Sequence, residues 1–268
     1  MTMRRILAGV LVIAMAATAL ADTTLNDGTV LSDAPAWIVT YIEVAADSVE
    51  KAEALIIEHT ATSKIENGNL RFEGLQRIGR SNHFAMLEAW SDPAARAAHA
   101  ASAGTISFRR ALQPMLYAPY DERPHVSLAA AATESIPSAD ASTIYVLTHA
   151  DIIPPEQFAP CRRASNPDGP CGNDLLTGLA KSSRNHAGNL RFDVLTQSNR
   201  GNHMTIVEMW DDADAQAAHQ THRDKTAFRN RLAGIEAGSG VDPDPQFILD
   251  MMTGSLWDER LYRLIGHR

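Results

Sequence analysis

The pentapeptide GNLRF stands at Gly68–Phe72 and again at Gly188–Phe192, 120 residues further along the chain. The repetition extends well beyond it. Without a gap, residues 68–112 align with residues 188–232, and 19 of the 45 positions are identical. Unrelated sequences of average composition would agree at roughly one position in fifteen to twenty. The alignment therefore identifies an internal duplication, in which one structural unit occurs twice.

The N-terminal residues 1–21 have the order of a secretory signal peptide. Arg4 and Arg5 precede an apolar run from Ile6 to Ala17, and Ala19-Leu20-Ala21 supplies small residues for cleavage. The alternative is a membrane helix, but the apolar run is short for crossing a bilayer. We therefore expect cleavage after Ala21, a periplasmic or secreted location, and no membrane segment in the processed chain.

The processed chain would be acidic, with 22 basic and 32 acidic side chains and a net charge of −10. This balance argues against nucleic acid or anionic lipid as a partner. Only two cysteines occur, Cys161 and Cys171. In an exported chain they predict one disulfide that closes a short loop, and two free thiols are the alternative.

The first copy has the pattern strand, helix, strand, strand, helix, strand. Apolar residues at helical spacing follow Asp47 and Ser48, either of which could cap a helix that ends near Gly68. Asp92-Pro93 is typical of a second helix start. The order βαββαβ predicts a ferredoxin-like sheet with both helices on one face. Its elements are expected as follows: strands at 37–44, 70–78, 83–90 and after Tyr117, a helix at 48–67, and a helix that begins at 93, turns at 103–104 and continues helical spacing to 112.

The strand at 83–90 carries apolar residues on both of its faces. Phe84, Met86, Glu88 and Trp90 alternate with a second, largely apolar set. The face without helices must therefore be covered, and the second copy is the obvious cover. We predict an α+β fold of tandem ferredoxin-like (βαββαβ) domains that form a pseudo-dimeric α+β barrel within one chain, with further homo-oligomers left open.

The predicted division of the chain follows from where the two copies stop aligning. Relative to the first copy, the second gains fourteen residues in its first helix region, where both cysteines lie, and seventeen around residues 238–252. Residues 127–142 are rich in Ala, Ser and Thr and are typical of a linker. The expected units are a signal peptide (1–21), an N-terminal extension (22–36), a first domain (37–127), a linker (128–142) and a second domain (143–268).

Two polar residues recur on otherwise apolar surfaces. Glu88 and its counterpart Glu208 would be carboxylates on an apolar face. One alternative is structural, a salt bridge to a cation such as Arg71, Arg80 or Arg109. The other is functional, a carboxyl group whose raised pKa lets it exchange a proton as a general base in a cavity. His99 and its counterpart His219 lie on the second helix, as packing histidines or as bases near neutral pH. His59 has Leu179 as its counterpart, so a catalytic His59 would leave only one working half.

The order His59, GNLRF, Glu88-Ala-Trp90-Ser-Asp92, His99 and Phe108 resembles the antibiotic biosynthesis monooxygenase (ABM) family of dimeric α+β barrels. The resemblance covers both copies. The family's E-x-G is present as Glu66-Asn67-Gly68 in the first copy, but the second copy has His186-Ala187-Gly188. This departure indicates that the second half is the more degenerate site.

The resemblance implies a cavity for an electron-rich aromatic ring. It implies a monooxygenase acting on quinol, phenolic or polyketide-like aromatic substrates with O2, without flavin, metal or another cofactor. Haem degradation is disfavoured, because His99 and Arg109 stand where haem-degrading relatives carry Trp and His. The competing hypothesis is a non-catalytic periplasmic binding or stress-related protein that holds an apolar ligand. Predicted catalytic residues are His99, Glu88 and His59, and predicted substrate-binding residues are Trp90, Phe84, Arg109, Asn82, Glu208, Trp210, His219 and Arg229.

Overall fold

The structure is a computed structural model that describes residues 23–24, 30–31, 35–151, 172–232 and 256–266. The predicted signal peptide, Cys161 and Cys171, and the segment around residues 238–252 lie outside the described residues. Within the described residues, no helix is long and apolar enough to cross a membrane.

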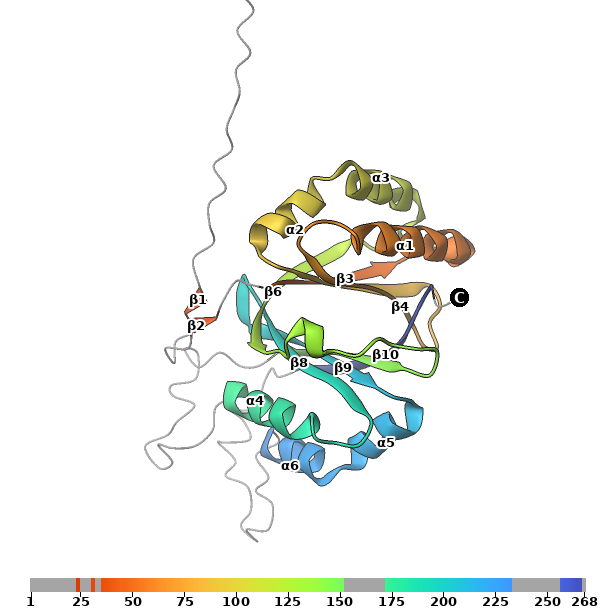
Figure 1. The fold of residues 1–268 in the computed structure, drawn as a ribbon. Helices are drawn as coiled ribbons and strands as arrows, with labels where there is room; N and C mark the ends of the chain where they lie inside the picture. Colours follow the sequence, from red (N-terminus) through yellow and green to blue (C-terminus); the bar gives the residue numbers. More distant parts are fainter. Residues whose placement is uncertain (1–22, 25–29, 32–34, 152–171, 233–255, 267–268) are drawn as a thin grey trace, which may run out of the picture.

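Each copy contributes four strands to one barrel and packs its helices outside it (Figure 1). The first copy comprises β3 (Ala36–Glu43), α1 (Val49–Ser63), β4 (Asn69–Arg77), β5 (His83–Trp90), α2 (Pro93–Ala100), α3 (Ala103–Leu112) and β6 (Asp121–Ala129). The second comprises β7 (Ile144–Asp151), α4 (Gly172–Ser183), β8 (Asn189–Gln197), β9 (Arg200–Trp210), α5 (Ala213–Thr221), α6 (Arg223–Leu232) and β10 (Leu256–Leu264). Outside the copies, β1 (Thr23–Thr24) pairs with β2 (Val30–Leu31).

The strands form a closed antiparallel barrel in the order β10-β4-β5-β3-β6-β8-β9-β7. The last strand of each copy joins the two halves, because β6 pairs with both β3 and β8, and β10 pairs with both β7 and β4. Closure leaves no free sheet edge in the barrel. The prediction of a pseudo-dimeric α+β barrel of tandem ferredoxin-like units is confirmed.

Three hydrophobic cores hold this arrangement together. The barrel interior draws on both copies, as with Trp37 and Leu87 from the first and Tyr145 and Val207 from the second. The other two cores lie between each half of the sheet and its own helices. In Figure 1, α1, α2 and α3 cover one side of the barrel, and α4, α5 and α6 cover the opposite side. The apolar face left open in one copy is therefore covered by the other, as expected.

The repeated GNLRF is the junction between the first helix and the next strand. Gly68 and Gly188 have φ angles of 80° and 74°, a region that favours glycine. A β-carbon built on Gly68 would lie 2.5 Å from the β-carbon of Ala95 on α2. The junction thus fixes how closely the second helix approaches the strand.

Two local predictions in the first copy are wrong. The alternation of the strand predicted at 70–78 places Leu70 on the same face as Phe72, but a β-bulge between Asn69 and Arg71 intervenes. Leu70 is 43% exposed, whereas Phe72 is buried. Ser48 does not cap α1 through its side chain, and a short 3-10 turn (Ala46–Ser48) leads into the helix instead. The cap predicted for α2 is present, because the Asp92 carboxylate accepts a hydrogen bond from the amide of Ala95 at 2.8 Å.

The segment between the copies takes part in the barrel core. Its residue Ile136 is buried among the side chains of the barrel interior. Arg71 donates hydrogen bonds to the carbonyls of Ile136 and Pro137, both at 3.2 Å. The same guanidinium pairs with the buried Glu73 at 2.6 Å. Composition predicted only a linker, yet this segment packs against the inside of the barrel.

Candidate functional site

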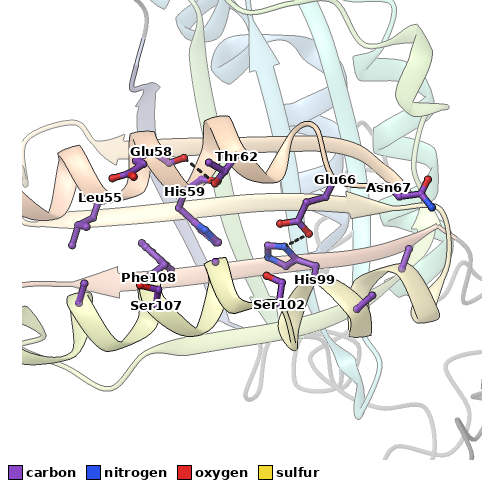
Figure 2. Close-up of a pocket in the computed structure, with 14 residues that line it drawn as sticks. Leu55, Glu58, His59, Thr62, Glu66, Asn67, His99, Ser102, Ser107 and Phe108 are labelled. Carbon is purple, nitrogen blue, oxygen red and sulfur yellow. Dashed lines mark hydrogen bonds and ion pairs between the residues drawn. The ribbon is translucent and has the colours of Figure 1, made fainter.

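A cavity of about 590 Å³ lies between α1 on one side and α2 and α3 on the other. Such a volume suits a ligand of one to three aromatic rings. Figure 2 shows His59 on α1 and His99 on α2 facing one another across it, with Glu66 beside His99. The lining residues are Leu55, Glu58, His59, Thr62, Glu66, Asn67, Ala95, Ala98, His99, Ser102, Gly104, Ser107, Phe108 and Ala111.

His99 connects the cavity to the buried polar groups behind it. Its Nδ1 lies 2.9 Å from Glu66 Oε2, and its Nε2 lies 3.3 Å from the Thr105 hydroxyl. The ring stacks on the indole of Trp90, with centroids 4.6 Å apart. Burial lowers the pKa of His99 below its ordinary value. The imidazole is therefore neutral at neutral pH and able to accept a proton.

Glu88 lies behind His99 and does not line the cavity. Its Oε2 accepts a hydrogen bond from Trp90 Nε1 at 2.9 Å and lies 3.9 Å from His99 Nε2. Burial raises the pKa of Glu88 to about 7, although the Trp90 hydrogen bond opposes that shift. For Glu88 the salt-bridge alternative is wrong, since no arginine pairs with it among the described residues. The raised-pKa alternative fits the structure.

His59 forms the opposite wall of the cavity together with Phe108. The two rings are stacked with centroids 4.0 Å apart and planes 5° apart, and His59 lies 5.3 Å from the ring of His99. Burial lowers the pKa of His59 to about 4, and repulsion from Arg109, and from His99 whenever His99 is protonated, acts in the same direction. At neutral pH the cavity thus presents two uncharged imidazoles.

Three further predicted site residues lie away from the cavity lining. The guanidinium of Arg109 is bound to Glu122 and stands over the ring of Tyr120 at 4.9 Å. Phe84 is part of the core beneath the helices. Asn82 donates a hydrogen bond from the hairpin to the carbonyl of Val44 at 3.3 Å. Trp90 also lies outside the lining, where it supports His99 from behind.

The second half repeats the buried core of the site with different surroundings. Trp210 donates a hydrogen bond to Glu208 at 2.9 Å, and the ring of His219 stacks on Trp210 with centroids 4.5 Å apart. Lys225 stands at the position of Thr105, fully buried, with its Nζ 3.7 Å from Glu208 and 2.7 Å from Glu259.

The outer residues of the second half also differ from those of the first. Leu179 occupies the position of His59 and is packed in the apolar core. Arg229 lies 3.9 Å from Glu259, as Arg109 pairs with Glu122 in the first half. The pairing of a histidine on the first helix with His99 therefore belongs to the first half.

Sequence reasoning missed the roles of Glu66 and Thr105. Glu66 was noted only as part of E-x-G, yet it is the direct partner of His99. The sequence did contain a signal for Glu66, because the second copy has His186 at this position. Polar positions that differ between the two copies indicate where the two sites differ. Thr105 lies six residues after His99 and carried no pattern of its own.

Comparisons with known proteins agree with this geometry. The sequence matches the antibiotic biosynthesis monooxygenase family over residues 35–111 and 173–231, which is just over half of the chain. The chain belongs to this family and carries two of its domains in tandem. A comparison with curated protein sequences gives no match.

Solved structures show the same fold at low sequence identity. A candidate monooxygenase from Fusobacterium nucleatum subsp. nucleatum has a TM-score of 0.66 at 14% identity, covering 88% of this chain and 94% of its own. One from Lactobacillus acidophilus has a TM-score of 0.61 at 10% identity, covering 87% and 95%. An anthrone oxidase-like protein has a TM-score of 0.56 at 12% identity, covering 88% and 94%. The chain is thus monooxygenase-like in family, and these structures share its fold.

Proposed function

We propose that the protein is a monooxygenase that uses O2 without flavin or metal and acts on a quinol, phenolic or polyketide-like aromatic substrate in the first-half cavity. The observation that carries this proposal is the pair of neutral imidazoles of His59 and His99, which face one cavity of about 590 Å³. An aromatic ring fits beside Phe108, and a phenol proton has an acceptor within the same cavity.

In the proposed mechanism, His99 removes the phenolic or enolic proton. The Glu66 carboxylate, 2.9 Å from Nδ1, stabilises the imidazolium that forms. His59 remains uncharged and donates a hydrogen bond to the resulting oxyanion. Glu88 and Trp90 hold the ring of His99 from behind and act as positioning residues.

The anion is electron-rich enough to transfer an electron to O2 directly. One oxygen atom then becomes bonded to the ring carbon, and the other leaves as water with the two hydrogens of the substrate. A phenol and O2 thus give a quinone and water, and the ring supplies all the electrons. The protein binds the ring, takes the proton and stabilises the anion.

The test is oxygen uptake by the purified chain with a panel containing a hydroquinone, a naphthol and an anthrone, after treatment with a chelator. His99→Ala should lower kcat/KM by roughly 10²- to 10⁴-fold, the usual contribution of a general base. His83→Ala, which changes a histidine of the hairpin, should leave it unchanged. Uptake that requires added flavin or metal, or that survives in His99→Ala, would refute the mechanism.

The non-catalytic binding hypothesis predicts a different result in the same experiment. A binding protein would quench tryptophan fluorescence saturably with members of the panel while consuming no oxygen. His59→Ala, in the cavity wall, would then weaken binding without any activity to lose. Oxygen consumption at a rate proportional to the protein concentration excludes this hypothesis.

We also propose that the protein is exported, as its N-terminal sequence indicates. The mass of the protein recovered from outside the cytoplasm should correspond to a chain that begins at Asp22. Recovery of the full-length chain from the cytoplasm alone would contradict this proposal. The same mass measurement would reveal whether Cys161 and Cys171 are oxidised.

A further inference from the structure

The second half holds a group of metal-ligating side chains that the proposed function does not use. His186, His222 and Asp224 each offer one ligand atom, and these three atoms lie within 4.8 Å of one another. His186 Nε2 lies 3.2 Å from Asp224 Oδ2, and His222 Nδ1 lies 3.7 Å from the same oxygen. Two imidazoles and one carboxylate form a donor set that divalent transition metals accept.

The duplication relates the positions of these three residues to the cavity of the first half. By the spacing of 120 residues, His186, His222 and Asp224 occupy the positions of Glu66, Ser102 and Gly104. All three first-half residues line the cavity of the first half. The same wall that faces a ligand in one half therefore carries three potential metal ligands in the other. None of the three replacements is needed for the fold, because the first half folds without them.

Both ring nitrogens of His186 have partners in the second half. Its Nδ1 lies 3.0 Å from Nδ1 of His219. Its Nε2 lies 3.2 Å from Asp224 Oδ2 and, without a metal, donates its proton to that carboxylate. A metal ion would replace this proton on Nε2, while Nδ1 keeps its contact with His219, as in ligating histidines whose other nitrogen is held by a hydrogen bond.

The charges around the group leave room for a cation. Arg223 is 91% exposed and lies 3.5 Å from Asp224 Oδ1, on the other side of the carboxylate. Lys225 is directed away, toward Glu259 and Glu208. His222 is partly exposed, and its Nδ1 accepts a hydrogen bond from the Asp224 amide at 3.2 Å, so that atom carries no proton. A metal would take this lone pair in place of the amide.

A second group of the same composition is less suited to a metal. His149, Asp151 and His203 also lie within 4.8 Å of one another. There, however, the Arg123 guanidinium donates to His149 Nδ1 at 3.0 Å. Its fixed positive charge beside a prospective ligand opposes a cation. This group serves as the matched control.

We propose that His186, His222 and Asp224 bind one divalent transition-metal ion of the Zn²⁺ class, with water completing the coordination. The two halves of the duplication would then have separate tasks, an aromatic ligand in the first and a metal ion in the second.

The experiment is calorimetric titration of Zn²⁺ into the full chain, prepared without an affinity tag and treated with a chelator. One Zn²⁺ should bind per chain, and Co²⁺ should give the visible absorption of a site with nitrogen and oxygen ligands. His222→Ala and Asp224→Ala change partly exposed side chains, and each should weaken binding at least about tenfold. His203→Ala should leave the titration unchanged, and circular dichroism of each variant verifies folding.

Each outcome of the titrations either supports or overturns the proposed metal site. Binding that is lost in His222→Ala and Asp224→Ala but retained in His203→Ala supports the site. No binding to the intact chain overturns it. Binding retained in both second-half variants, or lost only in His203→Ala, also overturns it and assigns the metal to another group. Oxygen uptake plays no part in the readout, so the result is independent of the proposed function.

Discussion

Substituting Glu88 with glutamine removes a buried carboxyl that has no cation beside it. Burial raises its pKa from 4.5 to about 7 in the folded protein. The folded state therefore binds more protons than the unfolded state between these two values. The stability contributed by this group is fully present below pH 4.5, falls as the pH rises through that window, and is constant above about pH 7.

The expected size of the effect follows from the same values. A shift of about 2.5 units at 1.36 kcal/mol per unit corresponds to about 3 kcal/mol. The amide of glutamine can still accept the hydrogen bond of Trp90 Nε1, but it does not titrate. The difference in free energy of unfolding between Glu88→Gln and the unmodified chain should thus be about 3 kcal/mol more favourable to the variant at pH 8 than at pH 4. This difference is measured by urea denaturation of both proteins at pH 4 and at pH 8, with tryptophan fluorescence as the signal of unfolding.

Glu208→Gln is the matched control, because the same carboxyl position in the second half has a buried lysine beside it. Lys225 would lose one of its two carboxylate partners and keep Glu259. Breaking a buried ion pair typically costs about 3 kcal/mol or more, so this variant should be less stable than the unmodified chain at pH 8. Burial raises the pKa of Glu208 as well, but the charge of Lys225 opposes that shift, and Glu88 has no such lysine. We therefore expect the two substitutions to change stability in opposite directions at pH 8. An effect of Glu88→Gln that is equal at pH 4 and pH 8 would refute the reasoning.

Two further predictions concern the fold. Gly68→Ala should destabilise the protein by about 2 to 4 kcal/mol, because the left-handed φ and the contact with α2 both oppose a β-carbon. Gly79 also has a left-handed φ of 79°, but a β-carbon built there would have no atom within 4 Å, so Gly79→Ala should cost only about 1 kcal/mol. Equal losses of stability for the two variants in urea denaturation would contradict the close contact at Gly68. Ile136→Ala should cost about 2 to 5 kcal/mol if the inter-copy segment belongs to the core. Ile106→Ala, at a half-exposed position, should cost far less, and similar losses in both would place Ile136 outside the core.

The repeat and the alternation of apolar residues were sufficient to predict the barrel. Two identical GNLRF junctions fixed the register of the copies, and the apolar residues on both faces of the strand at 83–90 required that the second copy cover the first. Such patterns depend on local spacing, which the chain carries in one dimension. The bulge at Leu70 and the burial of Ile136 escaped prediction, because each depends on a partner distant in the sequence.

For the site, the sequence by itself identified His59, Glu88 and His99 as candidates, since titratable residues at apolar positions are unusual whatever surrounds them. It could not determine which of them share a cavity. The tertiary structure decided that His59 and His99 face each other, that Glu88 stands behind without an arginine, and that Arg109 belongs to Glu122. The physical reason is that pKa values and partners depend on burial and on distances between separate elements, and these exist only once the helices pack on the barrel.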